Sequence, residues 1–385
     1  MRIAHYAADL WADGGIATYV ERLTSAQRQS GHDVVWLCQA PPQGTPLRDH
    51  MHVVTDDTLY HTAATLNLDV LHAHRTLPMP LPTQPPFTVV RTMHGHQGGC
   101  PSGTRYLRRS QQPCDRTYHP FHCARMHVQE RCGSCRPKRM WQNFQRLQTE
   151  RAQTERVPTA TVSRYVHEMM VRAGCEPENM VVCPSPAPAV QPFIAPPSTH
   201  ARLLYAGRLA PEKGLSWLLD AMVHIDSSVV LHVAGSGTEA HTNAIYRHVE
   251  RLNLTERVRF HGWCEPSALT ALMTIAWIVV VPSVWNEPAG LVPLDAAAHG
   301  RFVVASNGGG LPEYVAPDAS TLVPPNDTEA LATALSHHLA TYPLLVEAGR
   351  RAQHHAAVTY SALHTARAYD RLYAEAATRR HALLA

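Results

Sequence analysis

The sequence predicts an α/β protein made of two doubly wound, Rossmann-like domains, and three observations carry this prediction. Short apolar runs alternate with longer helical patterns along most of the chain, which is typical of parallel β-α-β units. The 385 residues are too many for one ordinary domain and comfortable for two. Six prolines crowd residues 184–197, where neither a helix nor a central strand can form. We therefore expect a first domain over residues 1–185, a linker over 186–200 and a second domain over 201–360.

The composition is that of a folded globular protein, with 45% hydrophobic and 17% charged residues. No apolar run is long enough to cross a bilayer, and the first residues lack the pattern of a signal peptide. We therefore expect a cytoplasmic protein. Its nine cysteines would then serve as thiols or metal ligands rather than as a disulfide framework.

Positive charge is concentrated in one block of the chain. Residues 105–156 contain twelve Lys or Arg against four Asp or Glu, although the net charge of the whole chain is only +3. Such a block indicates an anionic partner, either a membrane surface, a phosphorylated acceptor or nucleic acid. A solvated helix face explains the same residues equally well.

The first domain opens with a strand at residues 2–7, a loop containing Gly14 and Gly15, and a helix at 16–29. This order is typical of a phosphate-binding loop, although the glycine pair would also serve as a plain turn. Further strands are expected at residues 33–38, 52–55, 69–72 and 87–93. His94 directly follows the last of them. One histidine among 26 is incidental by default, but the carboxyl end of a parallel strand is where open α/β sheets bind ligands.

A cysteine-rich, basic insertion is expected over residues 98–140. It holds five of the nine cysteines, namely Cys100, Cys114, Cys123, Cys132 and Cys135. Thiolates hold zinc tetrahedrally and staple a loop that lacks a core of its own, so four of these five are candidate ligands of a structural zinc. Only Cys132 and Cys135 have standard ligand spacing, and a reduced loop without metal is the alternative.

The second domain opens with a strand at residues 202–206, followed by Gly-Arg-Leu-Ala-Pro-Glu-Lys-Gly at 207–214. Gly207 frees the end of the strand. Arg208 and Lys213 place two positive charges beside it, which would neutralise a diphosphate ligand. Only two of the 34 basic residues are lysines, which indicates that Lys213 is kept for its compact ammonium group. Strands at 229–234 and 257–260 follow, the second leading to Trp263, which either offers a stacking face or belongs to the core.

Residues 279–313 organise this domain. A buried strand leads to Glu287, a tight turn ending at Gly290 and an apolar helix from about residue 291 to 299. The N–H groups at the start of such a helix attract anions. Glu287 and Asp295 are eight residues apart, so that two carboxylates could grip hydroxyl groups at opposite ends of one extended ligand. A nucleotide sugar, which has a polyol at each end of a diphosphate, suits this stretch.

The residues E-P-A-G-L-V-P-L-D at 287–295 resemble the E-x7-E signature of the GT4-type retaining glycosyltransferases, which have the GT-B fold and are also called glycosyltransferase group 1. The motifs G-R-L-A-P-E-K-G at 207–214, G-G-G-L-P-E at 308–313 and T-M-H-G at 92–95 are similar to motifs of the same family. Asp295 stands where the family has Glu, and Ala289 where it often has an aromatic residue.

The resemblance implies two Rossmann-like domains that face each other across a cleft, with a last helix at residues 361–385 that crosses back to the first domain. It implies transfer of a sugar from a UDP- or GDP-sugar to a saccharide or lipid-linked acceptor with retention of configuration, as in the synthesis of cell-surface polysaccharides or glycoconjugates. No DxD-type sequence calls for a catalytic metal. We expect the protein to act in the cytoplasm, at the inner face of the membrane, and not to bind nucleic acid.

The resemblance also implies roles for individual residues. Lys213 and Arg208 would neutralise the diphosphate, Glu287 would hold the sugar hydroxyls with the N–H groups of Gly309 and Gly310, and His94 would orient the sugar. The remaining residues expected to bind the donor are Gly14, Gly15, Gly207, Gly235, Gly262, Trp263, Gly290, Leu291, Val292 and Asp295.

A second hypothesis describes a non-catalytic protein. In it, a degenerate sugar-nucleotide fold would bind a protein or nucleic-acid partner through the cysteine-rich basic block, and the shorter carboxylate of Asp295 is its main support.

Overall fold

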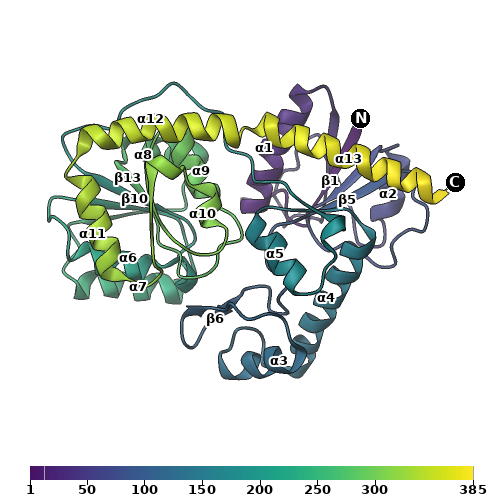
Figure 1. Ribbon diagram of the computed structural model, residues 1–385, viewed down its shortest axis with the longest axis horizontal. Helices are drawn as coiled ribbons and strands as arrows, with labels where there is room; N and C mark the ends of the chain where they lie inside the picture. Colours follow the sequence, from purple (N-terminus) through teal and green to yellow (C-terminus); the bar gives the residue numbers. More distant parts are fainter. Residues whose placement is uncertain (13, 385) are drawn as a thin grey trace. The chain divides into compact units, whose positions relative to one another are not determined.

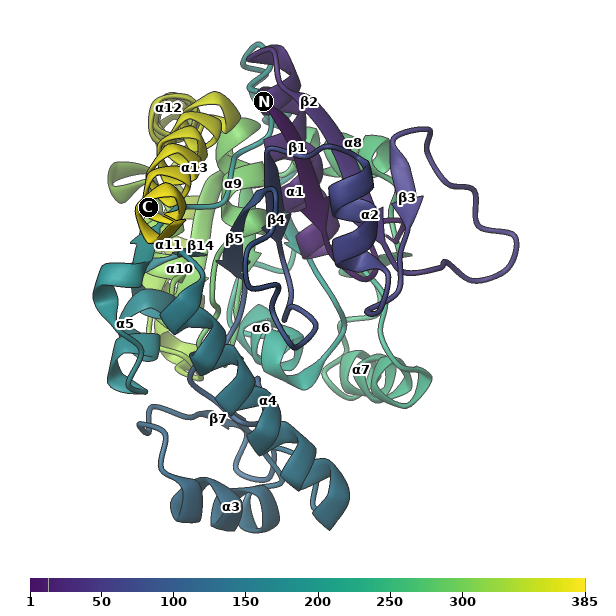
Figure 2. The same cartoon turned by 90° about the vertical axis from the view of Figure 1, so that its right-hand side faces the viewer.

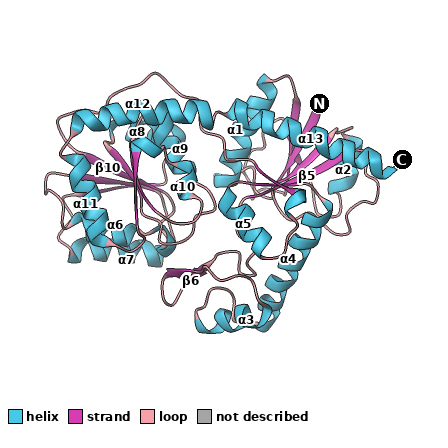
Figure 3. Cartoon of the chain, in the orientation of Figure 1, coloured by secondary structure: helices cyan, strands magenta, loops and turns pink. Residues whose placement is uncertain are grey.

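The computed structural model describes residues 1–12 and 14–384, with side chains through residue 379. The chain divides into two compact units, and each has its own parallel sheet covered by helices (Figure 3). Unit 1 comprises Met1–Thr104, Arg116–Pro186 and Ser361–Ala385, whereas unit 2 comprises Arg105–Asp115 and Ala187–Tyr360. The predicted α/β class with parallel sheets is therefore confirmed. Residue 385, the end of the expected last segment, lies outside the described residues.

Unit 1 is built on a parallel sheet with the strand order β3-β2-β1-β4-β5-β8-β9 (Figure 2). Its strands are β1 (Arg2–Tyr6), β2 (Asp33–Cys38), β3 (Met51–Val53), β4 (Val70–Ala73), β5 (Thr88–Met93), β8 (Thr159–Thr161) and β9 (Met180–Val182). Its helices are α1 (Gly15–Gln29), α2 (Leu59–Thr65), α3 (Pro120–Gln129), α4 (Pro137–Arg156), α5 (Arg164–Arg172), the short 3-10 helix η1 (Pro177–Asn179) and α13 (Ala362–Leu384). Every residue of β4 is buried, as expected of a parallel strand covered on both faces.

The last helix returns to unit 1, as the family resemblance implied. α13 packs against α1 and β5 (Figure 1). The hydroxyls of Tyr369 in α13 and Tyr19 in α1 lie 2.6 Å apart, and both side chains are buried. Residues more than 300 positions apart therefore share the core of this unit.

Unit 2 is built on a parallel sheet with the strand order β12-β11-β10-β13-β14-β15. Its strands are β10 (Arg202–Ala206), β11 (Val230–Ala234), β12 (Val258–Gly262), β13 (Ile278–Val281), β14 (Phe302–Ser306) and β15 (Ser320–Val323), and a separate hairpin consists of β6 (Tyr106–Leu107) and β7 (Gln112–Pro113). Its helices are α6 (Leu215–Met222), α7 (Glu239–Arg251), α8 (Pro266–Ile275), α9 (Leu291–Ala298), α10 (Leu311–Tyr314), α11 (Thr328–Leu339), α12 (Tyr342–Thr359) and the 3-10 helices η2 (Pro211–Lys213) and η3 (Pro317–Ala319).

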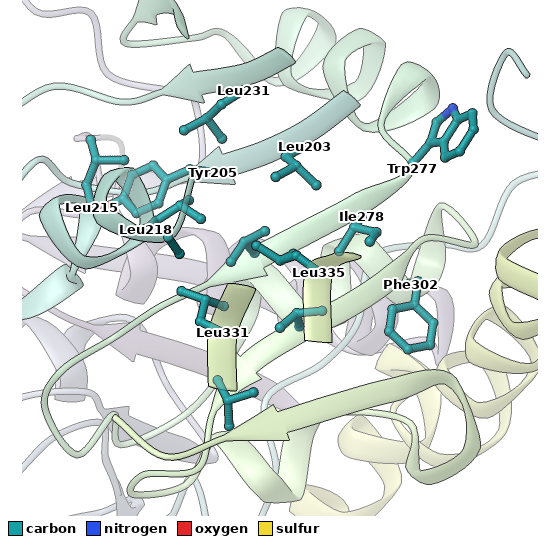
Figure 4. Packing of buried hydrophobic residues seen from close by; sticks show 14 of the residues in the cluster. Leu203, Tyr205, Leu215, Leu218, Leu231, Trp277, Ile278, Phe302, Leu331 and Leu335 are labelled. Carbon is teal, nitrogen blue, oxygen red and sulfur yellow. The ribbon is translucent and has the colours of Figure 1, made fainter. Parts of the chain in front are cut away.

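The core of unit 2 lies between the sheet and the helices that cover it (Figure 4). Strand side chains such as Leu203, Leu231 and Ile278 pack with Leu218 of α6 and Leu335 of α11, and all five are fully buried. Strands made of Val, Ile, Leu and Phe fit a parallel sheet because neither face meets water.

The cysteine-rich insertion was expected to belong entirely to the first domain, and this prediction is wrong for residues 105–115. The β6–β7 hairpin belongs to unit 2, where Tyr106 is only 4% exposed and packs into the core. Burial raises the pKa of Tyr106 to about 12. A large aromatic side chain gains more from such a core than the small hairpin can offer by itself.

The proline-rich stretch at residues 187–200 has no regular helix or strand, as predicted. It packs on unit 2 and is part of that unit, not a separate linker. Trp277 donates its indole N–H to the carbonyl oxygen of Pro197 at 2.7 Å. The guanidinium of Arg301 and the hydroxyl of Tyr342 donate to the carbonyls of Ile194 and Pro196. Proline lacks an N–H group but keeps its acceptor, so these carbonyls anchor the stretch.

α8 begins at Pro266, where proline suits the first turn of a helix, and its Leu272 and Met273 are buried. In the part of the chain that the structure describes, no helix combines the length and the apolar character that crossing a bilayer requires.

Gly214 lies where the loop after β10 comes close to the loop after β13. Its φ is +69°, and a Cβ there would lie 1.8 Å from the carbonyl oxygen of Pro282. We expect Gly214→Ala to lower the free energy of unfolding clearly more than Gly262→Ala, which has a similar φ of +66° but open space around it. The control should cost about 1–2 kcal/mol for its left-handed backbone alone. Equal losses in denaturant unfolding would contradict the close approach.

Candidate functional site

The predicted residues of unit 2 gather where its parallel strands end. The strand order reverses between β10 and β13, and open α/β sheets bind ligands outside such a switch point. The loop after β10 carries Arg208 and Lys213, and the loop after β13 carries Glu287. Both loops therefore start at neighbouring strand ends on the same edge of the sheet.

Lys213 and Glu287 form an ion pair across these two loops. Lys213 Nζ lies 2.5 Å from Glu287 Oε1, although 74 residues separate them in the chain. Ser283 donates its hydroxyl to the same oxygen at 2.6 Å. Glu287 is only 7% exposed, and a carboxylate so buried needs an opposite charge and hydrogen-bond donors. The ammonium of Lys213 also lies 5.4 Å from the centre of the Trp285 ring.

Three glycines at adjacent strand ends, Gly207, Gly235 and Gly262, hold the β10 loop close to the sheet. Gly207 donates its N–H to the carbonyl of Ala234 at 2.9 Å, and Gly235 donates to the carbonyl of Gly262 at 2.6 Å. At Gly235, with φ of +143°, a Cβ would lie 1.9 Å from the carbonyl oxygen of Gly207. Side chains are excluded there because the two backbones touch.

Gly309 and Gly310 support the backbone of Glu287. Gly310 donates its N–H to the carbonyl oxygen of Glu287 at 2.6 Å. Gly309 has φ of +62°, and a Cβ there would lie 2.3 Å from the same oxygen. The expectation that the N–H of Gly310 holds a sugar hydroxyl is wrong in this structure, because that N–H is bonded to Glu287. Gly310 instead shapes the loop that presents the carboxylate.

Helix α9 starts just after the Glu287 loop. Gly290 is its N-cap, Leu291 and Val292 open its first turn, and Asp295 lies in its fifth position. Asp295 is half-buried a little more than one turn from the start of the helix. N–H groups in the first turn of a helix have no acceptor within the helix, so this end of α9 favours an anion.

Arg208 and Trp263 are both more exposed than Lys213. Arg208 Nη2 lies 3.0 Å from Glu212 Oε1, and its side chain is 68% exposed. It shares the loop of Lys213 but pairs with another carboxylate. Trp263 is 51% exposed, so the alternative that it belongs to the core is wrong. Its ring is available at the carboxyl end of β12.

The predicted residues of unit 1 lie at the strand ends of their own sheet. Gly14 is the N-cap of α1 with φ of −179°, an extended conformation that any residue adopts, and Gly15 is the first helical residue. His94 follows β5 and is partly exposed. Its Nε2 lies 2.8 Å from His74 Nδ1, and burial lowers the pKa of His94 to about 3. His94 is therefore neutral near pH 7.

The five cysteines do not come together. Cys114 lies in unit 2, while the other four lie in unit 1. Three of these surround His127, whose Nδ1 is 2.8 Å from the carbonyl oxygen of Cys123 and 3.7 Å from Cys132 Sγ. Cys135 donates its thiol to the carbonyl of His127 at 3.0 Å. Among the described residues, the group of three side chains with ligand atoms within 4.8 Å is His5, His72 and His74, and no cysteine takes part.

Sequence reasoning missed three residues of the Glu287 loop and its surroundings. Ser283 lies four residues before Glu287, where the spacing could have suggested a contact. Asn286 precedes Glu287 directly and donates its amide to Asp115 Oδ1 at 2.7 Å. No local signal could have found Asp115, because it is 171 residues away in the β6–β7 segment.

Together, the switch point of unit 2 holds one cation, one buried carboxylate and a helix N-terminus. This arrangement can bind a phosphate group beside a group of hydroxyls, because cations and N–H groups attract phosphate oxygens and a carboxylate accepts from hydroxyls.

A comparison with protein families matches residues 190–355, nearly all of unit 2 beyond its hairpin, to the family described as "Glycosyl transferases group 1". A D-inositol 3-phosphate glycosyltransferase of Corynebacterium glutamicum is 37% identical over 187 residues, which cover 46% of this chain and 44% of the relative. A glycogen synthase of Mycobacterium tuberculosis is 35% identical over 150 residues, which cover 37% of this chain and 36% of the relative. The chain thus spans less than half the length of the curated relatives it matches.

Solved structures resemble the chain over almost its whole length. Sucrose-phosphate synthase from Thermosynechococcus elongatus has a TM-score of 0.75 at 22% identity, with 97% of this chain and 99% of that chain covered. Anabaena HepE, solved in complex with UDP-glucose, has a TM-score of 0.73 at 16% identity, with 98% of this chain and 100% of that chain covered. At such low identity these structures support the predicted GT-B fold and nothing more specific.

Zinc in unit 1 stays a prediction, which metal analysis can test with a built-in control. We expect about one zinc per chain, held near His127. Cys132→Ser and Cys135→Ser should lower the zinc content, whereas Cys114→Ser, in the other unit, should not. A wild-type preparation that is stable and metal-free, or equal zinc loss in all three variants, would contradict the prediction.

Proposed function

We propose that the protein is a glycosyltransferase of group 1, the family whose model matches residues 190–355, and that it transfers a sugar from a UDP- or GDP-sugar to a saccharide or lipid-linked acceptor with retention of configuration. The observation that carries the proposal is the contact between Lys213 and Glu287 at the switch point of unit 2. It supports the proposal because a sugar diphosphate needs a cation for its phosphate oxygens beside a carboxylate for its sugar hydroxyls.

The diphosphate would lie between Lys213 and the start of α9. Lys213 would share its ammonium between Glu287 and a phosphate oxygen, and the N–H groups of Gly290, Leu291 and Val292 would receive the other oxygens. Arg208 would add a second positive charge by leaving Glu212, since an exposed pair of this kind costs little to break. UDP bound to HepE supports a nucleotide diphosphate as the ligand class.

The two ends of the donor would meet different residues. Glu287 would accept hydrogen bonds from hydroxyls of the sugar, while Asp295, on α9, would accept them from the ribose diol. The exposed ring of Trp263, beside Gly262, offers a face for the nucleobase. Gly207 and Gly235 would let the ligand approach the backbone there, because neither has a side chain. The contacts expected of unit 1, His94 with the sugar and Gly14 and Gly15 with the diphosphate, stay predictions.

The proposed reaction is transfer of the sugar on the face from which the diphosphate leaves. The acceptor hydroxyl would attack the anomeric carbon on the face from which the diphosphate departs. The bond from that carbon to the diphosphate oxygen breaks, the new glycosidic bond forms, and the acceptor proton passes to the diphosphate. Negative charge grows on the leaving group, so cations fixed beside it stabilise the transition state more than the ground state.

A basic and aromatic face of unit 1 fits an anionic lipid surface at the inner face of the membrane. On α3, Phe121 and Val128 are 80% and 60% exposed, seven residues apart and hence on one side of the helix. Trp141, in the first turns of the neighbouring α4, is 63% exposed. Exposed cations in the same segment, residues 120–141, are Arg125, Arg131, Arg136, Lys138 and Arg139. Aromatic rings insert at the lipid interface while basic residues attract anionic headgroups.

Turnover tests the role of Lys213. We expect Lys213→Ala to lower transfer from UDP-, GDP- or ADP-sugars to a membrane-lipid extract by about 10²–10³-fold, the usual effect of removing one group that stabilises transition-state charge. Arg351→Ala is the matched control, because Arg351 also pairs with a glutamate, 2.8 Å from Glu347 Oε1, but on the exposed surface. Wild-type rates in a folded Lys213→Ala variant would contradict the phosphate role. No turnover with any donor, together with tight and salt-sensitive RNA binding, would favour the non-catalytic hypothesis.

Vesicle sedimentation tests the lipid-binding face. We expect the double variant Phe121→Ser and Trp141→Ser to bind vesicles containing phosphatidylglycerol at least about tenfold more weakly, because each lost ring forfeits more than 1 kcal/mol of apolar burial. Leu344→Ser, 60% exposed in unit 2, should bind like the wild type. Wild-type binding that is insensitive to salt, or equal on neutral phosphatidylcholine vesicles, would contradict the proposal.

A further inference from the structure

A network of buried polar side chains lies inside unit 1, between β1, β4, β5, α1 and α13. Its centre consists of three histidines, His5, His72 and His74, which are 0%, 0% and 3% exposed. Imidazole rings so deep in a core require hydrogen-bond partners.

One arm of this network leads from the core to His94. His94 Nε2 lies 2.8 Å from His74 Nδ1, and His74 Nε2 lies 2.9 Å from His5 Nδ1. At the inner end, His5 Nε2 lies 2.8 Å from Gln27 Oε1. The three rings thus form a chain in which each uses one nitrogen toward the next and which ends at a side-chain amide.

The other arm fixes that amide from the last helix of the chain. Gln27 donates its Nε2 to the hydroxyl of Tyr373 at 3.1 Å, and this hydroxyl lies 2.8 Å from His72 Nδ1. His72 Nε2 lies 2.7 Å from the hydroxyl of Thr92, which lies 2.7 Å from that of Tyr369. α13 therefore takes part in orienting Gln27.

All four histidines are neutral near pH 7. Burial lowers the pKa of His5 to about 4 and that of His94 to about 3, and it lowers the pKa values of His72 and His74 well below the usual value. A neutral imidazole carries one proton, so one nitrogen donates and the other accepts.

The protonated nitrogen of each ring then follows from Gln27. An amide oxygen only accepts, so His5 must carry its proton on Nε2 and offer Nδ1 as an acceptor. His74 must then donate through Nε2 and accept through Nδ1. His94 in turn must donate through Nε2, which leaves its Nδ1 without a proton.

We propose that Gln27 is a positioning residue, which acts through His5 and His74 to keep His94 in the Nε2–H tautomer and so makes Nδ1 of His94 a hydrogen-bond acceptor. An acceptor at the carboxyl end of β5 suits a hydroxyl group, which can donate to it, and disfavours a carbonyl or a phosphate oxygen, which cannot. The prediction that His94 contacts a sugar would make a sugar hydroxyl the donor, and this functional half rests on the proposed glycosyltransferase activity. The tautomer itself does not.

A metal ion held by the three central histidines would be the competing explanation, since one nitrogen from each ring lies within 4.8 Å of the others. The hydrogen bonds favour the proton network, because all six nitrogens of His5, His72 and His74 have partners at 2.7–2.9 Å. Metal binding would have to displace the proton shared between His5 and His74.

Nitrogen NMR of the histidine side chains reports the tautomer directly. In the wild-type protein we expect His94 to show a protonated Nε2 and an unprotonated Nδ1. Gln27→Met keeps the bulk but removes the amide oxygen, and it should convert at least part of His94 to the Nδ1–H tautomer. Tyr373→Phe, which removes one anchor of the amide, should act in the same direction more weakly. Tyr60→Phe is the matched control, since the Tyr60 hydroxyl bonds to the carbonyl of Pro78 outside the network.

The outcomes separate this proposal from the proposed function. Wild-type His94 protonated on Nδ1, a bound metal that shifts the His5 and His74 resonances on chelation, or a folded Gln27→Met variant with unchanged His94 would each overturn it. An inactive protein with the expected tautomers would contradict the glycosyltransferase proposal alone. If both hold, Gln27→Met should weaken donor turnover, and a donor that lacks the contacted hydroxyl should respond much less to the substitution.

Discussion

The arrangement of the loops at the strand ends of unit 2 depends on one contact, the ion pair between Lys213 and Glu287. It joins the loop after β10 to the loop after β13 at the one place where the strand order reverses. Close backbone contacts bring the two loops this near, since a side chain at position 214 would collide with Pro282 and one at 309 with Glu287. The buried carboxylate then needs the ammonium, and in the proposed function a departing phosphate group would need the same ammonium.

Unit 1 uses a different physical device at its own strand ends. The network histidines His5, His72 and His74 are buried, so desolvation keeps them neutral, and the hydrogen bonds between neutral groups order them. A neutral imidazole must donate a hydrogen bond through one nitrogen and accept one through the other. The tautomer of one ring therefore determines the tautomer of the next. Helix α13 closes this network through Tyr369 and Tyr373, which links the end of the chain to a residue at position 94.

The fold could largely be predicted from the sequence, because its strands are short apolar runs of Val, Ile and Leu that alternate with helical periods, and the glycine motifs mark their ends. The same motifs predicted that Lys213 and Glu287 serve one ligand, but not that they form an ion pair. What could not be predicted depends on contacts between distant segments: Asp115 beside Asn286, Tyr106 in the core of unit 2, and the proline-rich stretch bound through its carbonyls. The histidine network was missed because His5, His72 and His74 look incidental among 26 histidines until the neighbouring strands β1 and β4 bring them together.

Hydrogen–deuterium exchange of the wild-type protein with saturating UDP, GDP and ADP, one at a time, tests the diphosphate site most directly. If Lys213 and the start of α9 hold the diphosphate, at least one nucleotide should slow exchange in residues 207–214 and 287–294 together. Protection by none of the three, or protection confined to other segments such as α3 and α4, would contradict a diphosphate site at the switch point of unit 2.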